Sequence, residues 1–206
     1  MEVKDKEMYH YHHVYLFKDI WVPNNEFIVD NNFETSFLNI LKYYTTAVNT
    51  IEGNKREFDS IINSYLKEEQ DKETYIKLLK EARRIIVGAN IFKRELALEE
   101  VRKQKYPDLP SRKHSIWLCD EKGLKFWGKE LINEAHNELD LYKVSVTGNL
   151  FKSSDSFIPD NNLNYETILK QSENYWNPKF ENKEQEDKAE YLFQGKVKIL
   201  KKVNNI

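Results

Sequence analysis

Hydrophobic and polar residues follow a strand-like pattern near the start of the chain. Aromatic and β-branched residues fill Tyr9 to Phe17, and a second short apolar run covers Glu26 to Val29. Pro23 and Asn24–Asn25, which are residue types that favour turns, separate the two runs. The pattern predicts two strands joined by a turn.

The pattern changes to a helical period after Asn32. Apolar residues then recur at helical spacing in three successive segments, the first ending at Gly53 and the third before Pro107. This spacing predicts a block of three helices, at about residues 34–104, inserted after the second strand. The three apolar sets are Phe37, Ile40, Leu41, Tyr44, Ala47, Val48 and Ile51; Phe58, Ile61, Ile62, Tyr65 and Leu66; and Tyr75, Leu78, Leu79, Ala82, Ile85, Ile86, Ala89, Phe92, Leu96 and Val101.

Strand patterns return after Pro107 and Pro110, because a proline disfavours helix in the residue before it and donates no backbone hydrogen bond. A polar run at Glu181–Lys188 precedes the last strand, in which Gly195 predicts a bend. In chain order the predicted elements are a strand at Ser115–Cys119, a helix at Glu121–Glu138, a strand at Leu141–Val146, a helix from Tyr165 to Trp176 and a strand at Glu190–Val203.

The order of these elements predicts the fold class. Strands at both ends of the chain, separated by a run of helices, favour an α+β fold with a mostly antiparallel sheet over alternating βαβ units. A length of 206 residues is typical of one domain, so we expect residues 1–206 to form one. The sequence has neither G-x-G-x-x-G nor G-x-x-x-x-G-K-[ST], the two common phosphate-binding loops.

Charge and composition narrow the function classes. A formal net charge of −2 gives no electrostatic footprint for sequence-independent nucleic-acid binding, although a nucleic acid held locally as a substrate stays open. The single cysteine, Cys119, excludes an intramolecular disulfide and suits a reducing compartment. The first residues lack the pattern of a secretory signal, and no apolar run is long enough for a membrane helix. We therefore expect a cytoplasmic protein with no membrane partner.

Three histidines, His10, His12 and His13, fall within four positions. On a strand His10 and His12 share one face and His13 points to the other, and no acidic or cysteine partner stands at ligand spacing. The pattern therefore disfavours a metal site and indicates an aromatic-rich strand with partly exposed imidazoles. His13 is a candidate for lining a pocket.

Arg112, Glu190 and Tyr175 are the other residues whose chemistry stands out. Arg112 enters a predicted strand, where its planar fork of donors suits a phosphate or carboxylate, but the pattern alone favours a salt bridge that ties down the preceding loop. A carboxylate on a strand face, such as that of Glu190, is costly unless it lies at a rim or in a site. Tyr175 and Trp176 offer rings for stacking on a ligand, or for packing in the core. No G-x-S-x-G motif supports serine catalysis.

Five short segments are spread over nearly the whole chain: Tyr11–Val14, Arg94–Arg102, Pro110–Arg112, Tyr175–Trp176 and Glu190–Val197. Together they resemble a bacterial family of unknown function that is grouped with the ADP-ribosyltransferase-like superfamily. The resemblance implies split antiparallel β-sheets with an inserted helical segment, and NAD⁺ bound between the sheets.

The resemblance also implies three motif positions. They are His13, or His12 if the register shifts by one, on the first strand; Ser115 to Trp117 on a middle strand; and Glu190 at the start of a late strand. Cleavage of the nicotinamide–ribose bond develops an oxocarbenium-like cation, which a fixed carboxylate such as Glu190 stabilises. Arg112 is the candidate for the pyrophosphate and His13 for the adenosine-side ribose.

The expected function is therefore NAD⁺ consumption, with NAD⁺ as a substrate and no metal. Poly-ADP-ribosylating relatives have a tyrosine at the middle position, so Ser115 to Trp117 favour mono-ADP-ribosyl transfer, to an acceptor that the sequence does not identify, or NAD⁺ hydrolysis. The alternative is a non-catalytic module that binds a nucleotide or a protein on the same fold. By analogy with the superfamily alone, a toxin or phage-defence role is expected.

Overall fold

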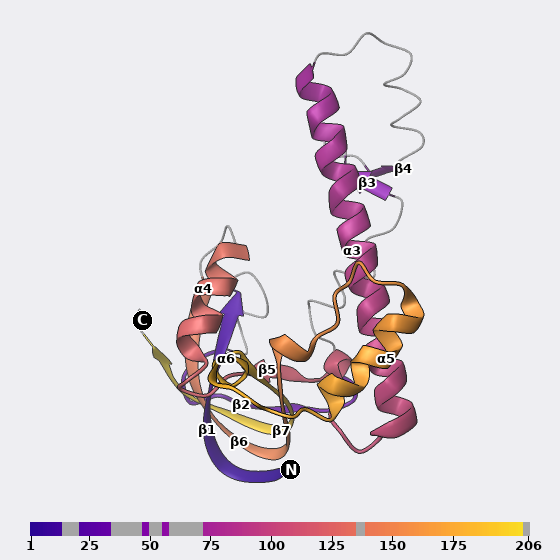
Figure 1. Ribbon diagram of the computed structural model, residues 1–206. Helices are drawn as coiled ribbons and strands as arrows, with labels where there is room; N and C mark the ends of the chain where they lie inside the picture. The colour runs from indigo at the N-terminus through magenta and orange to yellow at the C-terminus, as the bar shows by residue number, and fades with distance from the viewer. Residues whose placement is uncertain (14–20, 34–46, 50–54, 58–71, 135–138, 204–206) are drawn as a thin grey trace.

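The computed structural model describes residues 1–13, 21–33, 47–49, 55–57, 72–134 and 139–203 (Figure 1). Its strands are β1 (Glu2–His13), β2 (Glu26–Val29), β3 (Ala47–Asn49), β4 (Lys55–Glu57), β5 (Ile116–Leu118), β6 (Leu139–Ser154) and β7 (Ala189–Val203). Its helices are α3 (Lys72–Lys105), α4 (Leu124–Glu134), α5 (Tyr165–Trp176) and α6 (Lys183–Asp187), with the short 3-10 helices η1 (Arg112–His114) and η2 (Asp155–Phe157). The protein is therefore α+β, as the order of elements predicts.

An antiparallel five-stranded sheet forms the body of the structure. Its strand order is β1-β6-β7-β2, and β5 pairs with β7 beside β2. The first and last strands of the chain thus lie on either side of β6. The strands β3 and β4 pair separately as a two-stranded sheet.

The sheet curls so that β1 also meets β5. Tyr9 and Cys119 form an isolated antiparallel bridge, and each backbone N–H donates to the other residue's carbonyl at 2.9 Å. The segment β5 therefore lies between β1 and β7. Three segments that are far apart in the sequence become neighbours in this way.

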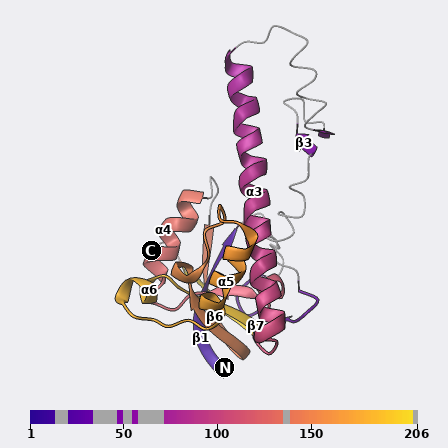
Figure 2. The same ribbon diagram turned by 45° about the vertical axis from the view of Figure 1, so that its right-hand side comes forward.

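Each face of the sheet carries its own core, because side chains alternate along a strand. One face buries Met8 of β1, Val144 of β6 and Phe193 of β7. The opposite face buries Phe151 and Leu192 against Leu98 of α3 and the two aromatic residues at the end of α5. Figures 1 and 2 show α5 beside the C-terminal half of α3, while the N-terminal half of α3 projects beyond the sheet.

The helices have local signals at their ends and along their faces. Asn164 caps α5, because its side chain accepts a hydrogen bond from the backbone N–H of Thr167 at 2.9 Å. The predicted buried stripe of α3 is wrong at several positions: Tyr75, Leu79, Ile86 and Leu96 are exposed, whereas Leu98, which the stripe omits, is buried. None of the described helices combines the length and the apolar character that a membrane crossing requires.

Most predicted elements from residue 72 onward are confirmed. The strand β5, the long helix α3 and the helix α5 lie where the periodicity places them, and Gly195, at which a bend is predicted, has a positive φ of 142°. The strand β6 extends to Ser154, eight residues beyond the predicted end at Val146, because the polar Thr147–Asn149 stretch interrupts the alternation without ending the pairing.

One prediction in the inserted block is wrong. Ala47–Asn49, at the end of the predicted helix 37–51, form the strand β3, which pairs with Lys55–Glu57 on the other side of Gly53. The β-branched Val48 suits a strand. Residues 37–46 of that helix and the predicted helix of Phe58–Leu66 lie outside the described residues.

Gly148 and Gly195 face each other in the β6–β7 pair, and both have positive φ, at 150° and 142°. A Cβ atom on Gly195 would lie 2.5 Å from the carbonyl oxygen of Thr147 and 2.8 Å from the Cα atom of Gly148. Both neighbouring atoms belong to the backbone and cannot rotate away. The close approach and the positive φ therefore require glycine.

We expect Gly195→Ala to lower the free energy of unfolding by at least about 1–3 kcal/mol, because it combines a strained φ with a backbone clash. Urea denaturation followed by circular dichroism measures the change. Lys201→Ala, at an exposed position of the same strand, is the control and should stay within about 0.5 kcal/mol of the wild type. A Gly195→Ala protein as stable as the control would contradict this role for the glycine.

Candidate functional site

Four polar side chains meet on the face of the sheet that α3 and α5 cover. Glu95 comes from α3, Arg112 from η1, Tyr175 from α5 and Glu190 from the start of β7. Their exposed fractions are 5%, 5%, 0% and 4%. We call these four residues the Arg112 cluster.

Arg112 is the centre of the cluster because it contacts the other three members. Its Nε donates to Glu95 Oε2 at 2.7 Å, and its Nη2 lies 3.4 Å from Glu95 Oε1. Its Nη1 donates to Glu190 Oε1 and to Tyr175 Oη, both at 2.6 Å. One guanidinium thus joins α3, α5 and β7 to the segment that leads into β5.

Glu190 is held through one of its two carboxylate oxygens. Oε1 accepts from Arg112 Nη1 and also from the hydroxyl of Tyr175. Both hydrogen bonds that the described residues make to this carboxylate go to Oε1. Oε2 is therefore the oxygen that is available to another donor.

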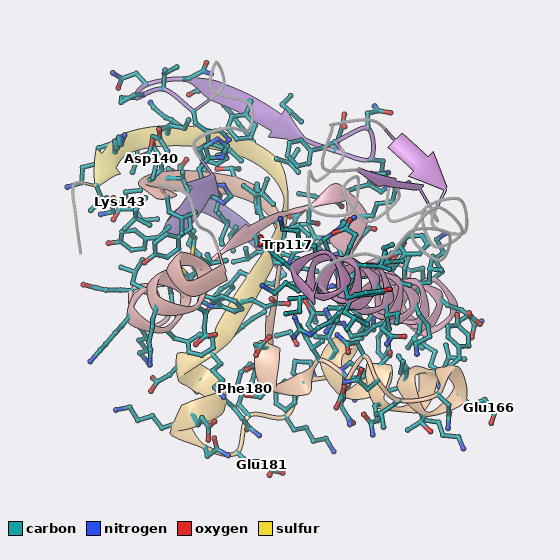
Figure 3. The ribbon with its side chains drawn as sticks, turned by 90° about the horizontal axis from the view of Figure 1, so that it is seen from above. Trp117, Asp140, Lys143, Glu166, Phe180 and Glu181 are labelled. Carbon is teal, nitrogen blue, oxygen red and sulfur yellow. The ribbon has the colours of Figure 1, made fainter. Side chains whose placement is uncertain are left out.

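The surroundings of the cluster fix its geometry. The guanidinium of Arg112 lies 4.8 Å from the ring centre of Tyr175 and 5.6 Å from that of Trp117. Ser153, the β6 partner of Glu190, donates its hydroxyl to the carbonyl of Tyr175 at 2.7 Å. Figure 3 shows Trp117 where β5 comes close to α3. The cluster is thus enclosed by aromatic rings and by a side-chain tether from β6 to α5.

Charges in and beside the cluster balance. Burial acts to raise the pKa of Glu95, but the positive charges of Arg112 and Arg94 outweigh it, so the pKa lies below its usual value of 4.5. Burial acts to lower the pKa of Arg112, and the charge of Glu95 with Tyr175 and Glu190 raises it well above its usual value. Burial chiefly raises the pKa of Tyr175, which keeps the phenol protonated. Two carboxylates therefore face two guanidinium groups.

Ser115 lies close to the cluster in the sequence, between η1 and β5. It is fully buried, and its hydroxyl has no hydrogen-bond partner in the described structure. Alternation along β5 places it on the same face as Trp117, whose β7 partner is Leu192, two residues after Glu190. A buried hydroxyl without a hydrogen-bond partner is rare in folded proteins, so Ser115 is a candidate for contact with a ligand.

His10 and His12 of the first strand lie on the sheet face opposite to the Arg112 cluster, and His10 Nδ1 lies 2.8 Å from the carbonyl oxygen of Trp117. His10 and His12 stack on the ring of Trp21, with centroid distances of 4.1 Å and 5.0 Å, on the face of the sheet that also buries Met8. The backbone of His13 is opposite Leu139 in the β1–β6 pair. The face that His12 and Met8 share is the one opposite to that of Glu190.

The structure thus brings together four of the residues predicted from the sequence and separates another. Arg112, Tyr175 and Glu190 are in direct contact, Trp117 lies beside the guanidinium, and His12 is elsewhere. The donors of Arg112 go to protein carboxylates and to a phenol, so the salt-bridge explanation accounts for its contacts. The ring of Tyr175 is in the core, where it packs against Trp176 at 4.9 Å.

Glu95 is a member of the cluster that the predicted apolar stripe does not single out. It precedes Leu98 by three residues and Val101 by six, a spacing that puts all three on one helix face. A glutamate in phase with the buried residues of a helix was the available signal. Among the described residues, no group of three or more His, Cys, Asp or Glu side chains is arranged to hold a metal ion.

The fold and the cluster define an α+β protein with a buried arginine–carboxylate network at the start of its last strand. A family model described as "Protein of unknown function (DUF2441)" matches residues 8–205, and the chain belongs to this family. No curated protein matches the chain.

The lowered pKa of Glu95 predicts a pH dependence of stability. Between the folded pKa and the usual value of 4.5, the unfolded chain binds more protons than the folded one. The stabilisation is therefore complete above this value and is lost as the pH falls through the folded pKa. We expect the stability difference between the wild type and Glu95→Gln to shrink when urea denaturation is repeated from about pH 6 down to pH 3. A difference that does not change with pH would contradict the ionised state of Glu95.

Proposed function

We propose that this chain is an NAD⁺-consuming enzyme of the ADP-ribosyltransferase-like type, which cleaves the nicotinamide–ribose bond and transfers a single ADP-ribosyl group. One observation carries the proposal. Glu190, at the start of a late strand, is a buried carboxylate fixed through Oε1 by an arginine and a tyrosine. A preorganised negative charge of this kind is what a developing cation requires.

The neighbourhood of the three strands supports the same proposal. The resemblance implies motif positions on the first strand, on a middle strand and at the start of a late strand. The corresponding segments β1, β5 and β7 lie side by side, through the Tyr9–Cys119 bridge and the pairing of Trp117 with Leu192. Glu190, Trp117 and Ser115 share one face of this group. His13 and the split of the sheet into two parts stay predictions.

The proposed chemistry assigns the work to Glu190. When the bond between the ribose C1′ and the nicotinamide nitrogen breaks, the electron pair leaves with neutral nicotinamide, and positive charge remains on the ribose. The carboxylate of Glu190 stabilises this charge, and an acceptor nucleophile or water then bonds to C1′ and gives up its proton. Arg112 and Tyr175 hold the carboxylate in place without touching the substrate.

A second candidate function rests on a different observation. Glu190 is only 4% exposed, and the donors of Arg112 are engaged by Glu95, Glu190 and Tyr175. An arginine that is tied in this way does not bind a pyrophosphate while its present contacts persist. The observation favours a non-catalytic module in which the Arg112 cluster stabilises the fold and a nucleotide or protein binds elsewhere.

Glu190→Gln tests the catalytic role, because it keeps the shape of the side chain and removes its charge. We expect nicotinamide release from NAD⁺ to fall roughly 10²- to 10³-fold, the loss that follows removal of one electrostatic stabiliser, while calorimetric affinity for NAD⁺ barely changes. Glu184→Gln, at an exposed position in α6, is the control and should keep full activity.

Two outcomes of this experiment would count against the enzyme. Equal release by the wild type and Glu190→Gln would remove Glu190 from the mechanism. NAD⁺ binding by the wild type without nicotinamide release, in the presence of candidate protein, nucleic-acid and small-molecule acceptors, would favour the non-catalytic module.

Ser115→Ala tests whether the buried hydroxyl serves a ligand. Removing an unpartnered hydroxyl should leave the free energy of unfolding unchanged or slightly higher, since no hydrogen bond is lost. If the hydroxyl binds NAD⁺, affinity should fall by about 1 kcal/mol, close to the value of one neutral hydrogen bond. Thermal denaturation and calorimetry of the same protein separate the two effects, and an unchanged affinity would remove Ser115 from the site.

A further inference from the structure

Glu95 holds one edge of the Arg112 guanidinium. The Glu95 carboxylate contacts Nε at 2.7 Å and Nη2 at 3.4 Å, which is one edge of the planar group. Nη1, which is not part of this edge, donates to Glu190 and Tyr175. Because the guanidinium is planar and rigid, holding one edge fixes the direction in which Nη1 points.

The contact of Arg112 with Glu190 is a single hydrogen bond. A guanidinium has a second edge, formed by Nη1 and the other N–H of Nη2, through which it can bind both oxygens of a carboxylate. Arg112 instead gives Glu190 one hydrogen bond, from Nη1 to Oε1. The orientation in which Glu95 holds the guanidinium therefore directs Nη1 to Oε1 and leaves Oε2 to another donor.

Glu95 is itself held by more than one contact. Its side chain is 3% exposed, and Arg94 Nη2 donates to its Oε1 at 3.2 Å. Its backbone lies in α3, which α5 supports through the hydrogen bond from Trp176 Nε1 to the carbonyl of Leu98 at 2.7 Å. The position of the carboxylate is therefore set by the packing of two helices.

We propose that Glu95 is a positioning residue for the proposed active site: it holds one edge of Arg112 and so fixes the orientation in which Nη1 anchors Glu190 through Oε1 and Oε2 stays available to the substrate. The catalytic part of this inference rests on the NAD⁺-cleaving function proposed above. Its structural part, the orientation of Arg112, does not depend on that function. Glu95 does not touch the substrate and acts through Arg112.

Glu95→Gln removes the charge with little change of shape. Arg112 then loses the charged partner that holds its Nε edge, so the guanidinium can turn and Glu190 loses its fixed anchor. We expect kcat for nicotinamide release to fall roughly 10- to 100-fold, as when a supporting contact of a reacting group is lost, with KM changed less than about twofold. Glu95→Asp, which keeps the charge on a shorter side chain, should recover part of the lost kcat.

Glu99→Gln is the matched control. Glu99 lies one turn further along α3 and is partly buried, and it pairs with Arg102 at 2.8 Å and accepts from Ser111 at 3.1 Å. Its loss removes an ion pair of the same helix without touching Arg112, so kcat should stay at the wild-type value. If Glu99→Gln and Glu95→Gln lower kcat equally, the effect belongs to the stability of α3 and the positioning role is wrong.

A second measurement does not depend on turnover. In protein labelled with ¹³C at the glutamate carboxyl carbons, the Glu190 signal, assigned by its loss in Glu190→Gln, should shift in Glu95→Gln and stay in place in Glu99→Gln. A Glu190 signal that does not respond to Glu95→Gln overturns the positioning role. A wild type that releases no nicotinamide, combined with the expected shift, overturns the proposed function and leaves the positioning of Arg112 intact.

Discussion

The burial of one arginine between two glutamates is the constraint on which the rest of this structure depends. A buried charge without a partner costs several kcal/mol, and removing one partner of a buried pair typically costs about 3–5 kcal/mol. Arg112 meets this constraint only if α3 supplies Glu95, β7 supplies Glu190 and α5 supplies Tyr175 at the same point. The relative placement of these three elements follows from the requirement.

The sheet also helps to place Glu190 beside Arg112. The long pairing of β6 with β7 carries Ser153 to Glu190, and Gly148 and Gly195 let the two backbones approach closely within it. The curl of the sheet brings β1 to β5. The Arg112 cluster therefore lies near the place where β1, β5 and β7, which are far apart in the sequence, become neighbours.

The sequence predicts the polar members of this site better than it predicts their contacts. Arg112 and Glu190 stand out because a charged side chain at a strand boundary needs a partner or a site, and Tyr175 because its ring can pack in the core or stack on a ligand. These three residues are in contact. Glu95 does not stand out, because glutamates are common on charged helices. Only the burial of Leu98, three residues later, shows that Glu95 lies on the buried face of α3. Two features depend on tertiary packing, which outweighs local periodicity: which face of α3 is buried near Leu96, and the strand at Ala47–Asn49. The pairing of Arg112 with two carboxylates, rather than with a ligand, depends on three-dimensional proximity that spacing does not contain.

The most direct measurement is a crystal structure of the protein with carba-NAD⁺, an analogue whose nicotinamide bond is not cleaved. We predict that the nicotinamide-side ribose lies against Glu190 Oε2, while Arg112 keeps its contacts with Glu95 and with Glu190 Oε1. The proposed role of Glu190 is wrong if the analogue binds away from Glu190, or if Arg112 leaves both glutamates and binds the pyrophosphate. Either result would move the function of the Arg112 cluster from holding a catalytic carboxylate to another role.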